Sequence, residues 1–392
     1  NSVVIAAGHT INIVNDNRAA ATAQVDGLLN INSTIGHNLG SVSGTGTIRL
    51  TPTVSNQYIF PGGNFASFVV PGGGTVEYNS AALATLPSQG TYNNILFTGV
   101  GQKNLFNTDL VINGNLTIQA GTIANVSNRN ISLKGNLTNN SGVAGFGTGT
   151  GTVTLSGGAQ SITGSTSFYR LTVNGAGDKT LNSSIIVTNQ LNLTQGVVVT
   201  GSNVLSTLAT SSVIGGSSSS YVNGNLQKYI STATSSKSYE IGDATAYAPI
   251  TVLFSGTTNG IGSITAYTLA GDHPNAATSG IDPSKSVNRT WGLQNSGVTG
   301  FTSVNVQFNF NASDLDLGVN TSNLNVSRYA SSTWTAHTVG VRTATSTQVT
   351  GITTFGEFQL AEPFSAGITW TGAVNSDWNN PGNWNPNILP GG

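Results

Sequence analysis

The sequence predicts an all-β protein. A right-handed parallel β-helix, a solenoid, precedes an antiparallel β-sandwich of Ig-like type and a Trp-rich joining element. Three observations lead to this prediction: charged residues are scarce, the first half of the chain contains an internal repeat, and the second half contains longer alternating runs without that repeat. The expected domains are residues 1–215, 216–363 and 364–392.

The composition argues against helices. Charged residues make up 7% of the 392 residues and hydrophobic residues 37%, whereas an ordinary soluble domain contains about 25% charged residues. Gly, Ser, Thr and Asn fill the difference, and these residues favour turns and the polar faces of strands. Helix surfaces normally carry Lys and Glu, so the sequence indicates short strands joined by many turns.

Charge and cysteine content exclude several classes of partner and site. The 13 Lys and Arg residues balance 14 Asp and Glu residues, so we expect no binding to nucleic acid or to an anionic membrane surface. The absence of Cys excludes disulfides and thiolate metal sites. No apolar run reaches the roughly 20 residues of a membrane helix, so direct membrane insertion is not expected.

The first domain contains two matching segments, residues 74–150 and 151–215, at an offset of about 76 residues. The matched positions include apolar residues, glycines and a lysine: Ile95 with Leu171, Gly99 with Gly175, and Lys103 with Lys179. Repetition of this kind indicates a solenoid, whose stacked units bury a continuous apolar interior. The residues expected to point inward are Leu116, Ile118, Leu137, Leu191 and Leu193.

The dipeptide Asn113-Gly114 leaves an alternative open. It lies between two short apolar runs, residues 110–112 and 116–118, and Asn-Gly in that position usually forms a tight hairpin. In a solenoid the same residues mark a corner, because both tolerate left-handed conformations. The repeat favours the corner, and a β-sandwich with hairpins is the alternative for residues 1–215.

The segment GGSSSS, residues 215–220, is a change in composition that indicates a domain boundary. Beyond it, alternating runs separated by turn residues predict the strands of an antiparallel sandwich. These runs are APITVLFSG (248–256), GSITAYTL (262–269), SVNVQFNFN (303–311), LNVSRYA (324–330), TSTQVTGI (345–352) and FGEFQLA (355–361).

The stretch TWTGAVNSDWNNPGNW, residues 369–384, holds three of the five Trp residues. Joined end to start, the sequence reads NPNILPGGNSVVIAAGHTINIVND, in which a Pro-Gly turn leads into an alternating strand. We therefore expect one period of a longer tandem array. A solenoid end exposes unpaired backbone groups unless it is capped, so Trp370, Trp378 and Trp384 are expected to cover the first coils of the following unit.

Five longer segments of the sequence can be compared with known protein modules: GTVTLSGGAQSITGSTSFYRLTVNG, SVNRTWGLQNSG, SRYASSTWTAHTV, GITTFGEFQLAEP and TWTGAVNSDWNNPGNWNPNILP. They resemble the modules of giant repetitive adhesins on Bacteroidota surfaces, including the gliding-motility adhesins. The resemblance implies type IX secretion, an extracellular location on the bacterial cell surface, and attachment to surfaces or polysaccharide. It brings no catalytic residues to this chain.

Catalysis is not expected. Many parallel β-helices cleave polysaccharides, but that chemistry needs clustered carboxylates, usually with Arg or Lys. Residues 1–215 contain only five carboxylates, widely separated in sequence: Asp16, Asp26, Glu77, Asp109 and Asp178. The four histidines, His9, His37, His273 and His337, lack metal-ligand spacing and are expected at the surface or in turns.

Two kinds of ligand site are possible from residue types alone. Trp291, Tyr329 and Trp334 are candidates for a sugar-stacking platform, with core packing as the competing explanation. Asn375, Asp377 and Asn379 place oxygens at alternate positions, as calcium loops do, and Asp314 and Asp316 do so more weakly. Calcium takes six to eight oxygens, so Asx-turns are the competing explanation and no cofactor is assigned.

Together these observations predict a structural and adhesive repeat unit of a long filamentous bacterial surface protein. Its expected partners are neighbouring units of the same polypeptide and extracellular surfaces or polysaccharides. The alternatives are a carbohydrate-binding module and, last, a β-helix polysaccharide lyase or hydrolase.

Overall fold

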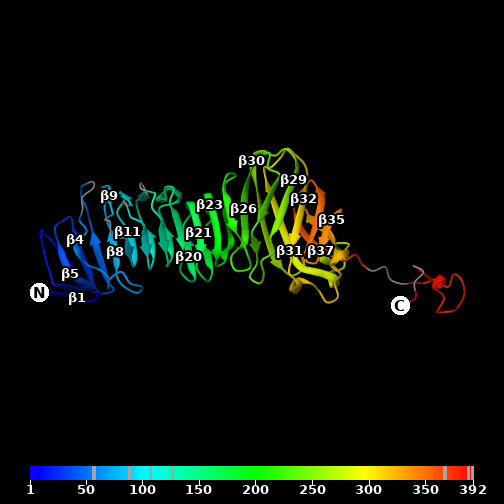
Figure 1. The fold of residues 1–392 in the computed structure, drawn as a ribbon, viewed down its shortest axis with the longest axis horizontal. Coiled ribbons are helices and arrows are strands. Elements are labelled where there is room, and N and C mark those ends of the chain that lie inside the picture. Colours follow the sequence, from blue (N-terminus) through cyan, green and yellow to red (C-terminus); the bar gives the residue numbers. More distant parts are fainter. Residues whose placement is uncertain are drawn as a thin grey trace.

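The chain forms an elongated all-β molecule with its two termini at opposite ends (Figure 1). The structure is a computed structural model, and it describes residues 1–54, 59–86, 90–105, 108–124, 128–364, 369–385 and 389. The helices in these residues are short 3-10 turns: η1 (Val143–Gly145), η2 (Ala276–Thr278), η3 (Pro283–Lys285), η4 (Ala312–Asp314), η5 (Thr321–Asn323) and η6 (Pro381–Asn383). None of the described helices has the length and apolar character needed to cross a membrane.

The first half is a β-solenoid of about 11 coils, one coil being one circuit of the chain, which confirms the predicted all-β solenoid. One face runs the whole length as a parallel sheet (Figure 1). Its strands are β2 (Thr10–Asn12), β4 (Leu28–Asn32), β6 (Thr47–Leu50), β8 (Thr75–Tyr78), β11 (Asn94–Phe97), β14 (Leu116–Ile118), β17 (Leu137–Asn139), β20 (Gln160–Thr163), β22 (Lys179–Leu181), β24 (Val198–Thr207), β26 (Val222–Thr232) and β28 (Ile241–Gly242). We call it the long face.

Other parallel sheets complete the coils. A second face consists of β10 (Thr91–Tyr92), β13 (Leu110–Ile112), β16 (Ile131–Leu133), β19 (Thr152–Leu155), β21 (Thr166–Asn174), β23 (Ile185–Gln195) and β25 (Ser212–Gly215). Two four-stranded sheets are β1 (Ser2–Ile5), β3 (Thr22–Val25), β5 (Asn38–Ser43) and β7 (Gly62–Asn64), and β9 (Ala84–Thr85), β12 (Gln102–Asn104), β15 (Thr122–Ala124) and β18 (Phe146–Gly147).

The interior of the solenoid contains buried aromatic rings and stacked aliphatic side chains from successive coils. On the long face the register places eight buried residues in one column: Leu29, Ile48, Val76, Ile95, Leu116, Leu137, Ile162 and Leu181. All five residues that the sequence predicts to point inward are buried. Alternation within each short strand therefore produces the core, because successive side chains of a strand point to opposite faces of its sheet.

Asn113-Gly114 is a corner and not a hairpin. The strands on either side of it, β13 and β14, pair in parallel with β16 and β17 of the next coil and belong to different faces. A ladder of side chains follows this corner: Asn94 Oδ1 accepts from Asn115 N, and Asn115 Oδ1 accepts from Asn136 N, both at 2.8 Å. The hairpin alternative for this part of the chain is wrong.

The two sequence segments that match at an offset of about 76 residues share a corner motif. Their matched residues do not stack on one another in the solenoid. Ile95 stacks between Val76 and Leu116 on the long face, whereas its sequence match Leu171 stacks on the second face. The shared feature is the corner sequence Gly-x-Gly-x-Lys, at residues 99–103 and 175–179. A Cβ at Gly99 would lie 2.1 Å from Ser80 N, and one at Gly175 would lie 2.0 Å from Gly157 O, so only Gly allows adjacent coils to approach this closely.

A fully buried lysine closes each of these two corners. Lys103 Nζ donates to the carbonyl oxygens of Gly99, of Gly101 at 2.6 Å and of Ser80 at 3.4 Å. Lys179 Nζ donates to carbonyl oxygens of the preceding coil, Gly157 and Gly158, and of its own corner, Gly175, Ala176 and Gly177. The ammonium groups thus satisfy carbonyls that the tight corners turn inward. Burial lowers the pKa of Lys103 to about 8 and lowers the pKa of Lys179 as well.

Beyond residue 215 the chain builds two antiparallel sheets. The first continues from β26 through β30 (Asn259–Ala270), β31 (Ser286–Ser296), β37 (Glu357–Ala361), β33 (Asn325–Ala330) and β34 (Thr333–His337). The second consists of β27 (Ser236–Tyr239), β29 (Ile250–Gly256), β32 (Phe301–Asn309), β36 (Ser346–Ile352) and β35 (Val339–Thr343). Each of the six runs predicted to be strands overlaps one of these strands.

The solenoid and the first antiparallel sheet share strand β26. Val222 pairs in parallel with Val198 and Ile241, whereas Leu226 pairs in parallel with Leu205 and antiparallel with Ala266. Parallel pairing therefore continues past the boundary predicted at residue 215. Between the two antiparallel sheets, the rings of Trp291, Phe308 and Phe358 pack in contact, with centroids 5.1–5.2 Å apart.

A buried ion cluster joins the same two parts. The fully buried Arg289 of β31 pairs with Asp314 in η4 at 2.9 Å and with Asp243, which directly follows β28. Three hydrogen bonds from Thr245 and Ala246 also reach Asp243 Oδ1. The cluster therefore fixes the end of the last parallel strand against the antiparallel part.

Replacing Lys103 by Met should lower the free energy of unfolding by about 1–3 kcal/mol, because three buried carbonyls lose their donor. It should also change the pH dependence. The pKa of Lys103 is about 8 in the folded chain against 10.5 for a free lysine. Between those values the unfolded chain binds more protons at this site, so its contribution to the free energy of unfolding rises with pH. Chemical denaturation at pH of about 7.5 and 9.5 measures both effects.

The matched control is Lys134→Met. Lys134 is exposed and its Nζ donates to Asn113 Oδ1 at 2.9 Å, so this change should stay within about 0.5 kcal/mol of wild type at both pH values. An identical rise with pH in wild type and Lys103→Met would contradict the assignment.

Candidate functional site

An aromatic cluster lies at the surface of the first antiparallel sheet. Tyr329 of β33 and Trp334 of β34 are paired across a hairpin, and their ring centroids lie 5.0 Å apart. His273, from the loop after β30, contacts both rings at 4.5 Å and 4.9 Å. The rings meet at angles of 50° to 79°, so the cluster forms an aromatic corner and not a flat platform. Tyr329 and Trp334 are half-buried.

Polar groups hold this corner in place. Asn275 accepts from Trp334 Nε1 through its main-chain oxygen at 2.9 Å and donates its side-chain amide to Tyr329 Oη at 2.8 Å. His273 Nδ1 accepts from Asn275 N, so the ring proton lies on Nε2 and is donated to Glu357 at 2.8 Å. Asn275 itself is exposed. The site therefore combines two accessible rings with one accessible amide, the groups that bind sugar rings and their hydroxyls.

Glu357 connects the cluster to the sheet beneath it. Its second oxygen accepts from Tyr267 Oη at 2.6 Å. Burial, together with the carboxylate of Glu357, raises the pKa of Tyr267 well above its ordinary value. Tyr267 therefore stays protonated and fixes the carboxylate, and Glu357 in turn fixes His273.

Two sequence expectations need correction here. Trp291 does not join Tyr329 and Trp334, because it is fully buried, packs on Phe308 and donates from Nε1 to Ala248 O at 3.4 Å. His37 and His273 lie in loops between strands, but neither is a surface histidine: both are buried, and the ring of His37 accepts from Arg18 N. Both histidines can be buried because each of their ring nitrogens has a hydrogen-bond partner.

The three tryptophans near the C-terminal end contact one another. β38 (Thr369–Trp370) pairs with β39 (Trp384–Asn385), and the ring of Trp384 lies edge-on to Trp370 at 4.8 Å and to Trp378 at 4.5 Å. Asn383 is fully buried and organises the loop, since its oxygens accept from the backbone of residues 371, 372, 374 and 375. We call residues 369–385 the Trp element.

The calcium candidates in the Trp element act as loop-forming residues. Asn375 Oδ1 accepts from Asp377 N and from Asn383 Nδ2, and Asp377 Oδ1 accepts from Asn379 N at 3.0 Å. These are Asx-turns. The weaker candidates, Asp314 and Asp316, bind Arg289 and the Ser286 and Asn288 donors. Among the described residues, no group of three or more acidic or histidine side chains has the arrangement of a metal site.

The structure also brings together two carboxylates that are far apart in the sequence. Asp26 and Glu77 line one groove of about 350 Å³ on the long face, together with His9 and Arg49. Register explains this, because Arg49 and Glu77 are paired neighbours on β6 and β8. Carboxylates that are widely separated in the sequence therefore line the same groove.

The groove lacks the features of an acid–base pair. Glu77 is buried, and its two oxygens accept from Arg49 at 2.8 Å and Thr98 at 2.6 Å. Hydrogen bonds from the Gln24 side chain and Thr45 N lower the pKa of Asp26. A general acid needs a raised pKa near the working pH, whereas both of these carboxylates are held as hydrogen-bond acceptors.

The fold and these sites define the chain as a β-solenoid protein with an antiparallel extension, carrying aromatic side chains at two separate surfaces. Comparisons with protein-family models, curated proteins and solved structures find no match to the chain.

Sequence reasoning identified Tyr329 and Trp334 but missed Asn275, Glu357 and His273. The two aromatic residues lie within one hairpin, where a separation of five residues brings them together. The other three come from segments more than 20 residues away, and only the strand order brings them to the site. No local pattern in the sequence indicates that order.

We predict stability losses of different size for the two tryptophans proposed as ligand residues. Trp291→Ala should lower the free energy of unfolding by about 3–5 kcal/mol, because it removes a large side chain from the core. Trp334→Ala should cost about 1 kcal/mol, since it loses one hydrogen bond and edge contacts at a half-exposed position. Urea denaturation followed by circular dichroism measures both. Equal costs would contradict the placement of Trp291 in the core and Trp334 at the surface.

Proposed function

We propose that the chain is a structural and adhesive repeat unit of a long filamentous protein on the outer surface of a bacterium. In this proposal residues 1–215 supply a right-handed β-helical rod, the two antiparallel sheets are an Ig-like sandwich, and the Trp element joins one unit to the next. The unit is exported by the type IX route, attaches to surfaces or polysaccharide, and serves adhesion or gliding. It acts by binding and has no catalytic role.

The observation that carries this proposal is the rod itself. About 11 coils stack along one axis and pass directly into the antiparallel sheet through β26, so the chain spans a long distance with a continuous backbone ladder. A solenoid can be lengthened by adding units, since each coil depends mainly on its neighbours. Such an architecture suits a spacer that carries an attachment surface away from a cell.

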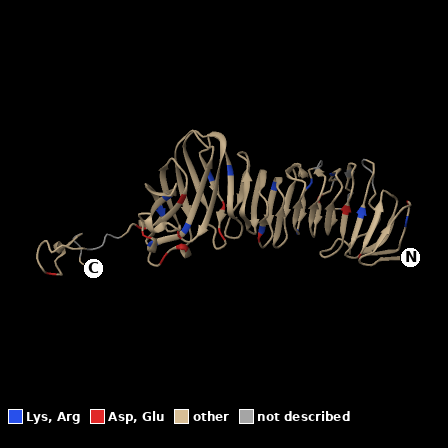
Figure 2. Cartoon of the chain, turned by 180° about the vertical axis from the view of Figure 1, so that it is seen from behind, with Lys and Arg blue, Asp and Glu red and all other residues tan. Residues whose placement is uncertain are grey.

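The surface chemistry supports a neutral target. Charged side chains are sparse on the solenoid in Figure 2, and the net formal charge is −1. The outward positions of β14, β17, β19 and β21 include Thr117, Thr138, Thr154 and Thr172. Uncharged hydroxyl-bearing faces favour hydrogen bonding to neutral polysaccharide over binding to nucleic acid or to acidic polymers.

A specific observation also favours a second candidate function, a carbohydrate-binding module. Tyr329, Trp334 and Asn275 present two rings and an amide at one surface of the first antiparallel sheet. Aromatic faces of this kind offer large contact area at low entropic cost. A polysaccharide lyase or hydrolase is the least supported alternative, because Asp26 and Glu77, the two carboxylates of the groove on the long face, already have hydrogen-bond partners.

We predict that beads coated with the folded chain remain attached to surfaces coated with neutral polysaccharide under flow. Beads coated with heat-unfolded chain at the same density are the control. Retention should depend little on salt between about 50 and 500 mM, because the solenoid surface that is proposed to bind the polysaccharide carries few charges. Retention no better than that of the unfolded control would overturn the adhesive proposal.

A glycan array probed with the full chain distinguishes the second candidate. The carbohydrate-binding module predicts a small set of bound glycans, and Trp334→Ala should weaken that binding about tenfold or more, as loss of a stacking residue does at hot spots. Val341→Ala, at an exposed position of β35, serves as the control. If Trp334→Ala does not change bead attachment, the rod is responsible for adhesion and the carbohydrate-binding module is rejected.

A further inference from the structure

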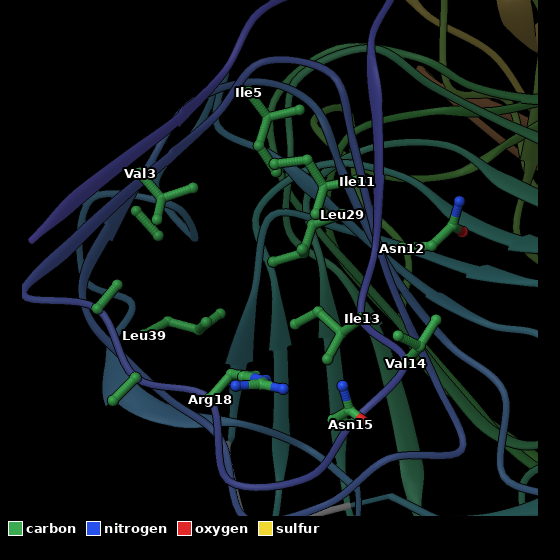
Figure 3. Close-up of a pocket in the computed structure, with 13 residues that line it drawn as sticks. Val3, Ile5, Ile11, Asn12, Ile13, Val14, Asn15, Arg18, Leu29 and Leu39 are labelled. Atoms are coloured by element: carbon green, nitrogen blue, oxygen red, sulfur yellow. The ribbon is translucent and has the colours of Figure 1, made fainter.

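The N-terminal end of the solenoid opens into an apolar pocket of about 320 Å³. Figure 3 shows Ile5, Ile11, Ile13, Leu29 and Leu39 around the same space, with Arg18 at one side. These residues are the interior positions of the first two coils. Further along the rod the same positions are filled by the next coil, whereas here the column of side chains ends.

Exposure changes abruptly at this end. Ile11 stacks on Leu29 in the register of β2 and β4, yet Ile11 is 40% exposed and Leu29 only 4%. Val14, which also lines the pocket, is exposed as well. Because exposed apolar side chains close together favour burial against a partner, this pocket is a candidate docking surface.

The opposite end of the molecule carries a matching group. In the Trp element, Trp370 is 41% exposed and Trp378 57%, and Val374 is exposed beside them. Trp384 is only 5% exposed, and its ring makes T-shaped contacts with both Trp370 and Trp378. Trp384 therefore forms the centre of the element, and the predicted three-residue joint narrows to Trp370 and Trp378.

The charges of the two ends are complementary. Arg18 lines the pocket, and Asp377 directly precedes the exposed Trp378. Neither residue belongs to any of the ion pairs found in the described part of the chain. Arg18 is the one charged residue that lines the pocket, and Asp377 is the one charged residue of the Trp element.

We propose that the Trp element of a second copy of this chain docks into the N-terminal pocket. The indole of Trp378 enters the space between Ile11, Ile13 and Leu39, and the carboxylate of Asp377 pairs with Arg18. The inference rests on the proposed function, since it makes the joint between units a defined contact. The two surfaces differ, so the contact is heterologous and repeats head to tail into an open filament.

Sedimentation of the full chain tests the contact. Wild type should form head-to-tail oligomers as its concentration rises to about 1 mM, a range in which contacts with millimolar Kd still form. Trp378→Ser and Val14→Asp should abolish them. Val341→Asp is the matched control for Val14→Asp, because Val341 is equally exposed but lies on β35. Thermal unfolding of each variant verifies that it folds.

Charge reversal identifies the partners. Arg18→Glu alone and Asp377→Lys alone should each weaken association about tenfold. An equimolar mixture of the two variants should restore it, because every contact in an alternating filament then joins opposite charges. Restoration in the mixture supports the proposal.

Two results would overturn the docking proposal: wild type that stays monomeric at about 1 mM, or charge-reversed variants that associate as well as wild type. The bead assay separates this failure from failure of the proposed function. Beads that attach while the chains stay monomeric leave adhesion standing without the joint. Chains that assemble on beads that do not attach leave the joint standing without adhesion.

Discussion

The whole structure depends on one constraint: each coil must pair its backbone with the coils on both sides while its interior stays apolar. The column from Leu29 to Leu181 satisfies the second requirement at eight successive levels of the long face. The first requirement is harder at the corners, where the chain turns and adjacent coils approach within backbone contact. The two Gly-x-Gly-x-Lys sequences, with their buried lysines, and the asparagine ladder lie at those corners.

Three devices satisfy the corner groups. Glycine allows close approach, as at Gly99 over Ser80. Asparagine side chains accept main-chain N–H groups of the next coil, as in the ladder from Asn94 to Asn136. Buried lysines bind carbonyls that point inward. Because unpaired buried backbone groups are costly, these devices explain why a chain with few charges still places Lys103 and Lys179 in its interior.

The sequence predicted the all-β solenoid and its interior residues, but it did not predict which strand belongs to which face. Alternating apolar positions identified Leu116, Leu137 and Leu191 as interior residues, because period-two alternation is set locally by the strand. The faces of a solenoid share that same alternation, so nothing in the sequence tells Ile95 on the long face from Leu171 on the second face. The candidate site follows the same division: Tyr329 and Trp334 come from one hairpin, whereas His273 and Glu357 meet only through the order of strands.

The mechanical consequence concerns where a chain of such units would yield. Within one unit the rod has no loose junction, because β26 belongs to both the solenoid and the antiparallel sheet, and Arg289 ties Asp243 to Asp314 across the same place. Pulling along the axis loads continuous ladders of hydrogen bonds and a buried ion cluster. The proposed joint, in contrast, depends on one indole, one ion pair and one apolar pocket. In a filament built this way, bending and reversible separation would therefore concentrate between units, and the rods would stay straight.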